Sequence, residues 1–221
     1  MTAIDFNAAR EQMIHQQLRA WDVLDQSVLD TVGRVPRQLF VPEGYAELAF
    51  ADVELPLGHG DRMLAPKVVG RILQAVAPRP TERVLEIGTG SGFLTACLAS
   101  SACSVRSLER RADLVAAARR HLEAATVRNA TVEHLDAYTE GALGTHAWDV
   151  IVLTGSLPLP DSRFEQQLAL GGRLFAVIGS GPVMEATLIE RLGTEQWRRT
   201  VLFETSLKAL VGARAGEVFS F

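Results

Sequence analysis

The sequence predicts an α/β fold whose central sheet has seven strands, is mostly parallel, and ends in an antiparallel hairpin. Short apolar strands alternate with helical segments from Arg83 to Ile178, a pattern typical of parallel strands joined by crossover helices. A glycine-rich turn follows the first of these strands, between Glu86 and Gly92. Near the end of the chain, two more strands are separated only by a turn, which is too short for a crossover helix. We therefore expect a Rossmann-like sheet that closes with a hairpin.

The bulk composition is that of an ordinary globular protein. The chain has 221 residues, of which 48% are hydrophobic and 22% are charged, enough for one complete α/β domain with a small extension. A net charge of −4 without a basic cluster disfavours a nucleic-acid partner. The N-terminus carries no secretory signal pattern, and no apolar run approaches the roughly 20 residues that span a bilayer. We expect a cytoplasmic protein that does not associate with membranes.

The chain divides into two parts of different character. Residues 1–80 are predicted to form an extension of helices and loops that contributes to the substrate side, and residues 81–221 a Rossmann-like domain. We expect both parts to pack as one compact unit. In the first part, Asp25 is a predicted N-cap and Pro66 sits in a predicted first helical turn. The expected elements are helices at 13–20, 25–32 and 66–76, with loops at 35–42 and 55–61.

The second part supplies the sheet. The run Asp149–Thr154 is apolar enough to predict a strand buried on both faces. Gly171 and Gly172 are predicted to end the helix before the fifth strand. The expected strands are 84–87, 104–109, 131–135, 149–154, 173–178, 183–191 and 197–204, and the expected helices are 92–100, 112–125 and 162–170.

The glycine-rich turn is the strongest local signal for a ligand. Glycines at positions 88, 90 and 92 allow the backbone to turn sharply and to approach a ligand closely. The dinucleotide fingerprint G-x-G-x-x-G is not met, because position 93 is Phe. The carboxylate of Glu86 would repel a pyrophosphate but suits a cationic amino-acid group. This pattern favours S-adenosylmethionine over NAD as the cofactor.

Two further acidic residues end the next two strands. Glu109 is placed where a carboxylate accepts hydrogen bonds from a ribose diol, and Asp136 where one accepts from an adenine amino group. Ligands of open α/β sheets bind at the carboxyl ends of the strands. The three strand-end acids therefore support a nucleoside ligand.

Over nearly its whole length the chain resembles the protein-L-isoaspartate O-methyltransferase family, which has the class I methyltransferase fold. The segment Val35-Pro36-Arg37-x-x-Phe40-Val41-Pro42 is the most specific match, because all class I methyltransferases share the glycine loop. The other matching stretches are Met13-Ile14-x-x-Gln17-Leu18, Leu55-Pro56-Leu57-Gly58-x-Gly60, Val84 to Gly92, Trp148 to Thr154 and Gly171-Gly172-Arg173-Leu174.

The resemblance implies a cofactor site and an acceptor site. Thr154 would lie near the methyl acceptor. The residues that would bind S-adenosylmethionine are Glu86, Ile87, Gly88, Thr89, Gly90, Ser91, Gly92, Glu109, Arg110, Asp136 and Ala137.

One loop departs from the family pattern. Where the family has Gln-Thr-Ile-Ser-x-Pro, this chain reads Asp61 to Pro66, with Arg62 and Leu64 in place of the two hydroxyl residues. An isoaspartyl carboxylate is already ionised at neutral pH and needs no general base, whereas a hydroxyl or amine acceptor does. His59 or Asp61 would be the candidate base, and Arg62 a candidate clamp for an acceptor carboxylate. The histidines show no metal-ligand spacing, so no metal is expected.

Several functions therefore remain open from the sequence. The first is carboxyl methylation of isoaspartyl residues in a peptide or protein. The second keeps the cofactor but uses another acceptor, such as an unidentified small molecule, because the loop at 61–66 has changed. The third is a catalytically silent module that binds S-adenosylmethionine, and an NAD-dependent oxidoreductase is the least favoured. The oligomeric state is not indicated.

Overall fold

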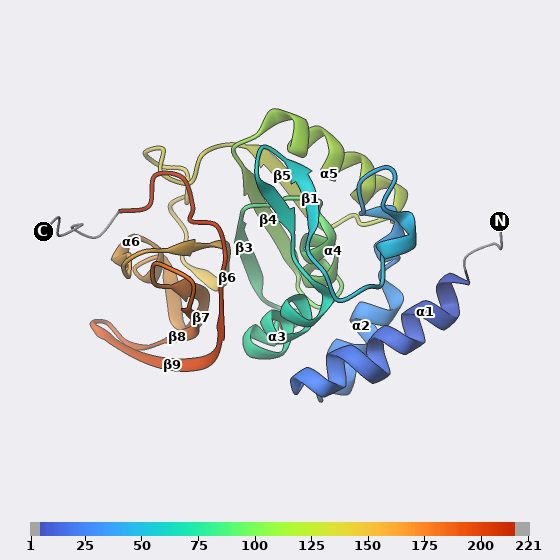
Figure 1. The fold of residues 1–221 in the computed structure, drawn as a ribbon. Coiled ribbons are helices and arrows are strands. Elements are labelled where there is room, and N and C mark those ends of the chain that lie inside the picture. Colours follow the sequence, from blue (N-terminus) through green and yellow to red (C-terminus); the bar gives the residue numbers. More distant parts are fainter. Residues whose placement is uncertain (1–4, 215–221) are drawn as a thin grey trace, which may run out of the picture.

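The protein is described by a computed structural model that covers residues 5–214. Its centre is a seven-stranded sheet with the order β5-β4-β3-β6-β7-β8-β9 (Figure 1). The first five of these strands are parallel, whereas β8 and β9 run antiparallel to their neighbours. The predicted parallel sheet with a terminal antiparallel hairpin is confirmed.

The chain begins with a longer helical stretch than the sequence predicts. Helix α1 spans Phe6–Gln12 and continues as a π-helical segment, Met13–Leu18, and a 3-10 turn, Arg19–Trp21. Helix α2 spans Gln26–Arg34, and its N-cap is the predicted Asp25, whose carboxylate accepts from the amide of Ser27 at 2.8 Å. Helix α1 starts earlier than the sequence predicts because Asp5 provides an additional N-cap.

The segment predicted as a loop at 55–61 is instead part of a small hairpin. Strand β1, Leu55–Gly58, pairs antiparallel with β2, Asp61–Met63, and Leu55 lies opposite Met63. His59 and Gly60 form the turn with positive φ angles of 52° and 78°. Helix α3 follows at Pro66–Val76, with Pro66 in its first turn as predicted. Residues 61–66 form the loop that departs from the family pattern, called the departing loop below. The hairpin therefore places this loop directly before α3, which packs on the sheet.

The parallel strands and their crossover helices lie close to their predicted positions. The strands are β3 Arg83–Ile87, β4 Ser104–Glu109, β5 Ala130–His134 and β6 Trp148–Leu157. The helices are α4 Phe93–Ala99 and α5 Ala112–Ala124. Strand β3 pairs with β4 on one side and with β6 on the other. The chain adds β4 and β5 on one side of β3 and then crosses over to add β6 and β7 on the other side. This is the switch point at which open α/β sheets bind ligands.

The helix predicted at 162–170 is wrong in its second half. Helix α6 spans only Ser162–Glu165, and strand β7 spans Leu168–Ile178, so Gly171 and Gly172 lie within a strand and do not cap a helix. Leu168 is buried and lies opposite Trp148 of β6, which places this segment in the sheet. Strand β8, Met184–Gly193, and strand β9, Gln196–Thr205, complete the sheet.

The core lies on both faces of the sheet. On one face Val84, Val150 and Phe175 pack with residues of α2 to α5 and of the N-terminal helical stretch. On the other face Leu85 and Ile151 pack with a second cluster that includes Trp148 and Phe164. Figure 1 shows α1 to α5 on one side of the strands and α6 on the other. Within residues 5–214, no helix is both long and apolar enough to cross a membrane.

Candidate active site

A cavity of about 740 Å³ opens at the carboxyl ends of β3, β4 and β6. Its wall combines the glycine-rich turn, the ends of three strands, the β1–β2 hairpin and the segment 206–211. The predicted residues on this wall are His59, Asp61, Arg62, Ile87, Gly88, Thr89, Gly90, Ser91, Glu109, Arg110, Asp136, Ala137 and Thr154. Sequence segments that are far apart in the chain therefore meet at one site.

The glycine-rich turn is shaped by a close contact with β6. Gly88 has a φ of +93°, and a Cβ placed on it would lie 2.2 Å from Oγ1 of Thr154. That hydroxyl donates to the carbonyl oxygens of Ile87 at 3.0 Å and Gly88 at 2.7 Å. Only glycine fits this position, because Thr154 occupies the space that a side chain would need.

Glu109 lies on the cavity wall at the end of β4. Its carboxylate accepts from the amides of Gly90 at 3.1 Å and Arg111 at 3.0 Å, which ties the strand end to the glycine-rich turn. Burial raises the pKa of Glu109, with the charge of Asp61 acting in the same direction, and the two amides oppose this shift. A fixed, largely buried carboxylate at this position can accept hydrogen bonds from a polar ligand.

Asp136 follows β5 and lies on the same wall. One carboxylate oxygen accepts from the amide of Tyr138 at 2.9 Å, and the other lies 3.8 Å from Nε of Arg110. Glu109 and Asp136 thus stand at the ends of neighbouring strands, as predicted from the sequence. Their contacts with a cofactor stay a prediction.

Glu86 and Gly92 are the two predicted residues that the structure does not bring to the cavity wall. Glu86 is fully buried beneath the turn and accepts from the hydroxyls of Ser107 at 2.6 Å and Thr95 at 2.5 Å. Its other carboxylate oxygen has no partner, and burial raises its pKa to about 7. Thr89 joins this network through a 2.6 Å hydrogen bond with Ser107. Glu86 therefore supports the turn from below.

Gly92 has a packing role in the structure. It is the N-cap of α4 with a φ of +87°, and a Cβ on it would lie 3.3 Å from Cβ of Ala118 on α5. The close approach of α5 behind the turn explains the glycine without a ligand contact.

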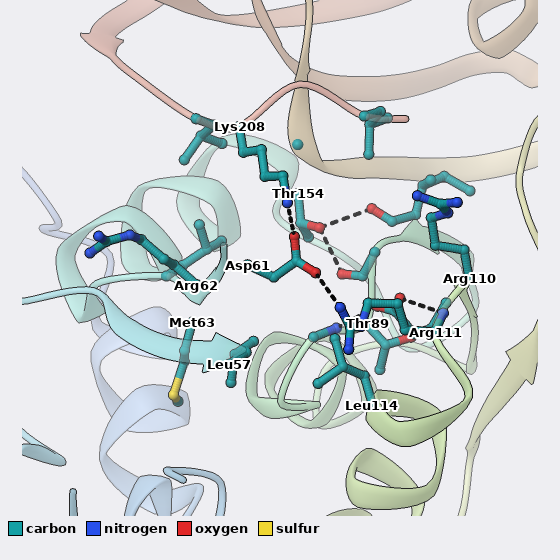
Figure 2. Close-up of a pocket in the computed structure, with 18 of the residues that line it drawn as sticks. Leu57, Asp61, Arg62, Met63, Thr89, Arg110, Arg111, Leu114, Thr154 and Lys208 are labelled. Carbon is teal, nitrogen blue, oxygen red and sulfur yellow. Dashed lines mark hydrogen bonds and ion pairs between the residues drawn. The ribbon is translucent and has the colours of Figure 1, made fainter. Parts of the chain in front are cut away.

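The departing loop lies at the mouth of the cavity (Figure 2). Arg62 is exposed, and its nearest carboxylate, that of Glu54, is 4.0 Å away. Leu64 is half-buried on the wall, and its carbonyl oxygen accepts from Nη2 of Arg37 at 2.8 Å. Asp61 forms an ion pair with Lys208, with 2.6 Å between Nζ and Oδ1.

Arg37 is a buried residue of the site that the sequence marked only as part of a motif. Its guanidinium is inaccessible to solvent, donates to the carbonyl oxygens of Ala49 and Leu64, and lies over the ring of Phe93 at 4.6 Å. Burial lowers its pKa to about 10, so it remains charged at neutral pH. The sequence feature that could have indicated a buried side chain is the position of this arginine within a largely apolar segment.

Lys208 and Arg111 are wall residues that the sequence did not single out. Lys208 follows β9 in a segment without a recognisable motif, so nothing in the sequence indicated its position. Arg111 follows Arg110 directly and stood next to a predicted residue. Among residues 5–214, no group of three or more His, Cys, Asp or Glu side chains is arranged to hold a metal ion.

Comparison with known proteins gives a consistent result. Residues 8–212 match the family model of protein-L-isoaspartate(D-aspartate) O-methyltransferases. A protein-L-isoaspartate O-methyltransferase of Burkholderia vietnamiensis is 41% identical over 207 residues, which cover 90% of this chain and 65% of that protein. One from Synechococcus is 39% identical over 177 residues, 80% of this chain and 72% of the relative. The chain thus matches somewhat less than two thirds of the Burkholderia protein's length.

Solved structures share the fold. A Plasmodium falciparum chain, assigned as a protein-L-isoaspartate O-methyltransferase and crystallised with S-adenosyl-L-homocysteine, superposes with a TM-score of 0.77 at 21% identity. The match covers 94% of this chain and 99% of that one. A second protein-L-isoaspartate O-methyltransferase gives a TM-score of 0.76 at 22% identity, over 90% of this chain and 65% of the other.

Proposed function

The chain belongs to the protein-L-isoaspartate(D-aspartate) O-methyltransferase family, and from that premise we propose that it methylates the free carboxyl group of isoaspartyl residues. The acceptor would be a peptide or protein, and the methyl donor S-adenosylmethionine. We also propose that residues 1–80 and 81–221 work as one unit, because Leu18 and Val84 belong to the same buried core.

The observation that carries the proposal is the cradle formed by Gly88, Thr154 and Glu109. A side chain on Gly88 would clash with Thr154, and Glu109 lines the same cavity with a carboxylate that the amide of Gly90 fixes. This arrangement fits an adenosyl nucleoside with an amino-acid tail, because the open turn admits backbone contacts and the carboxylate accepts from a diol. The residues proposed to hold the cofactor on this wall are Ile87, Gly88, Thr89, Gly90, Ser91, Glu109, Arg110, Asp136 and Ala137.

The chemistry that the site must perform is modest. When bound, S-adenosylmethionine supplies a methyl group attached to a positively charged sulfur. That methyl carbon would pass to the acceptor carboxylate oxygen as the carbon–sulfur bond breaks, with the bonding electron pair left on sulfur. No proton moves, because a carboxyl group with a pKa of about 4 is already ionised at neutral pH. The protein's task is to orient the two reactants and to exclude water.

The side chains on the cavity wall agree with an acceptor that needs no base. Among residues 5–214, His59 is the single histidine on this wall, and it lies on the exposed turn of the β1–β2 hairpin. Asp61 is engaged with Lys208 and Arg111. A hydroxyl or amine acceptor would require a free base within hydrogen-bond reach.

A second candidate function is methylation of a different acceptor. It is favoured by Arg62 and Leu64, which put a cation and an apolar side chain where the family loop carries hydroxyls. Both candidates use the same cofactor, so only the acceptor distinguishes them.

Transfer of a labelled methyl group tests the proposal. The protein is incubated with labelled S-adenosylmethionine and either a peptide with one isoaspartyl residue or the same peptide with ordinary aspartate. Label on the isoaspartyl peptide alone, released as methanol by mild base, supports a carboxyl ester. Cofactor binding without label on that peptide contradicts the isoaspartyl acceptor, and label on another molecule would then support the second candidate.

A further inference from the structure

The segment 206–211 forms part of the roof of the cavity. It is fixed to the end of β6, because the amide of Ser156 donates to the carbonyl oxygen of Lys208 at 2.9 Å and the amide of Leu210 donates back to that of Ser156 at 2.9 Å. Ser156 is fully buried. The backbone of Lys208 is therefore held in place, while its side chain extends toward the β1–β2 hairpin (Figure 2).

Two cations from separate parts of the chain converge on one carboxylate at this point. Nζ of Lys208 lies 2.6 Å from Oδ1 of Asp61, and Nη1 of Arg111 lies 3.6 Å from Oδ2. Figure 2 shows Asp61 between the two cationic side chains. All three residues line the cavity. The mouth of the cavity thus contains a carboxylate-binding pair that already holds a carboxylate.

We propose that Lys208 and Arg111 form the subsite that binds the carboxylate of the acceptor, and that Asp61 occupies this subsite until the acceptor displaces it. The inference rests on the proposed function, in which the acceptor group is itself a carboxylate. The side chain of Asp61 has the same charge and the same two oxygens as such a group, so it is an internal competitor for the same cations.

The energetics permit this exchange. The side chains of Lys208 and Asp61 are 53% and 30% exposed, and ion pairs that water reaches contribute little to stability. An incoming carboxylate that pairs with the same cations replaces most of that energy.

The loss of charge on the acceptor determines whether the subsite affects KM or kcat. The acceptor loses its negative charge as the ester forms, so a cation next to it stabilises the bound acceptor more than the transition state. Loss of the cation is therefore expected to raise KM without lowering kcat. Lys208 and Arg111 are thus binding residues that select an anionic acceptor.

The substitutions Asp61→Asn and Lys208→Gln test the proposal, because both break the same ion pair. If that ion pair only stabilises the structure, both substitutions shift acceptor affinity in the same direction. If Asp61 competes with the acceptor, Asp61→Asn strengthens acceptor binding and Lys208→Gln weakens it. We expect opposite shifts, each of up to about tenfold in Kd and KM, and no loss of kcat for Lys208→Gln.

The measurement is calorimetric binding of an isoaspartyl peptide in the presence of saturating S-adenosylhomocysteine, together with steady-state kinetics. A peptide whose isoaspartyl carboxyl is replaced by a carboxamide is the neutral probe, and neither substitution should change its affinity. Glu190→Gln is the matched control, since it breaks an ion pair between Glu190 and Arg198 of 2.8 Å in the β8–β9 hairpin, outside the cavity wall.

Opposite shifts that are absent for the carboxamide peptide support the subsite. Shifts in the same direction, no shift in either variant, or equal shifts for both peptides overturn it. The binding measurement does not require turnover, so it separates this inference from the proposed function. A wild-type protein that binds the peptide with the expected variant pattern but transfers no methyl group refutes the activity and leaves the subsite standing.

Discussion

The hydroxyl of Thr154 rests against the backbone of Gly88, 2.7 Å from its carbonyl oxygen and on the side where a Cβ would project. This contact joins β6 to the glycine-rich turn at the point where the sheet changes its direction of winding. The shape of the proposed cofactor site therefore depends on a glycine at position 88 and on a hydroxyl at position 154.

The substitution Gly88→Ala is expected to abolish cofactor binding and to destabilise the protein. The new methyl group would lie 2.2 Å from Thr154 Oγ1, at a φ of +93° that non-glycine residues rarely adopt. Gly141→Ala is the control, because Gly141 also has a positive φ of 73° but has no atom within 4 Å of the added carbon. The control should lose about 1 kcal/mol of unfolding free energy and keep its cofactor affinity. Equal cofactor affinity in both variants, measured by calorimetry, would refute the proposed cradle.

The substitution Glu86→Gln is expected to change how stability depends on pH. The pKa of Glu86 is raised from 4.5 to about 7 by burial, so in this interval the folded protein binds a proton that the unfolded chain has released. Stability contributed by the protonated carboxyl is then complete below pH 4.5 and is lost as the pH rises toward 7. Glutamine mimics the protonated form and cannot ionise.

The free energy of unfolding of Glu86→Gln, relative to the wild type, should therefore rise between about pH 4.5 and 7 and level off above it. The expected total is on the order of 3 kcal/mol. Urea denaturation at a series of pH values measures it. A difference that stays constant with pH would show that folding does not raise the pKa of Glu86.

The substitution Arg37→Lys is expected to destabilise the protein by about 2 kcal/mol or more, because a lysine amine cannot reproduce the planar fork that donates to Ala49 and Leu64. It should also loosen the loop that carries Leu64 and so reduce turnover. Arg34→Lys, at an exposed position at the end of α2, is the control and should change stability by less than about 0.5 kcal/mol. Chemical denaturation compares the two, and similar values would contradict an anchoring role for Arg37.

The substitution Leu64→Ser, alone or with Arg62→Thr, tests what the departing loop does. Leu64 lines the cavity without a polar group, so a hydroxyl at this position restores a feature that the family loop carries. We expect a severalfold higher kcat on an isoaspartyl peptide, with an unchanged affinity for S-adenosylhomocysteine. Turnover that appears only in the variant would favour a different natural acceptor. Turnover that falls in the variant would show that the leucine itself serves the isoaspartyl reaction.

The parallel part of the sheet could be predicted from the sequence because its signals are local. A short apolar run followed by glycines and a helical pattern identifies β3, the turn and α4 without any knowledge of the partners. The strand-end positions of Glu109 and Asp136 follow from the same pattern. Most of the predicted cofactor residues therefore reach the cavity wall.

The errors arise where distant partners decide the local structure. Residues Leu168–Leu170 have a pattern that fits a helix, yet they extend β7 because Leu168 pairs with Trp148 of β6. Leu55 and Met63 pair in a hairpin, although Pro56 and the two glycines that follow it favoured a loop. The ion pair between Asp61 and Lys208 joins residues 147 positions apart, and no short-range pattern predicts such a contact.

The burial of Glu86 shows a third limit. The sequence places an acidic residue before the glycines but does not reveal which face of β3 it occupies. Ser107 on β4 and Thr95 on α4 provide the hydroxyls that hold it in the core. Its partners, and not its position in the motif, keep it from the cavity wall.

Calorimetric titration with S-adenosylmethionine, S-adenosylhomocysteine and NAD tests the central claim most directly. We predict saturable binding of both adenosyl compounds, one per chain, and no heat from NAD. This binding should be lost in Gly88→Ala and kept in Gly141→Ala. A folded wild-type protein that binds neither adenosyl compound at millimolar concentration would contradict the account.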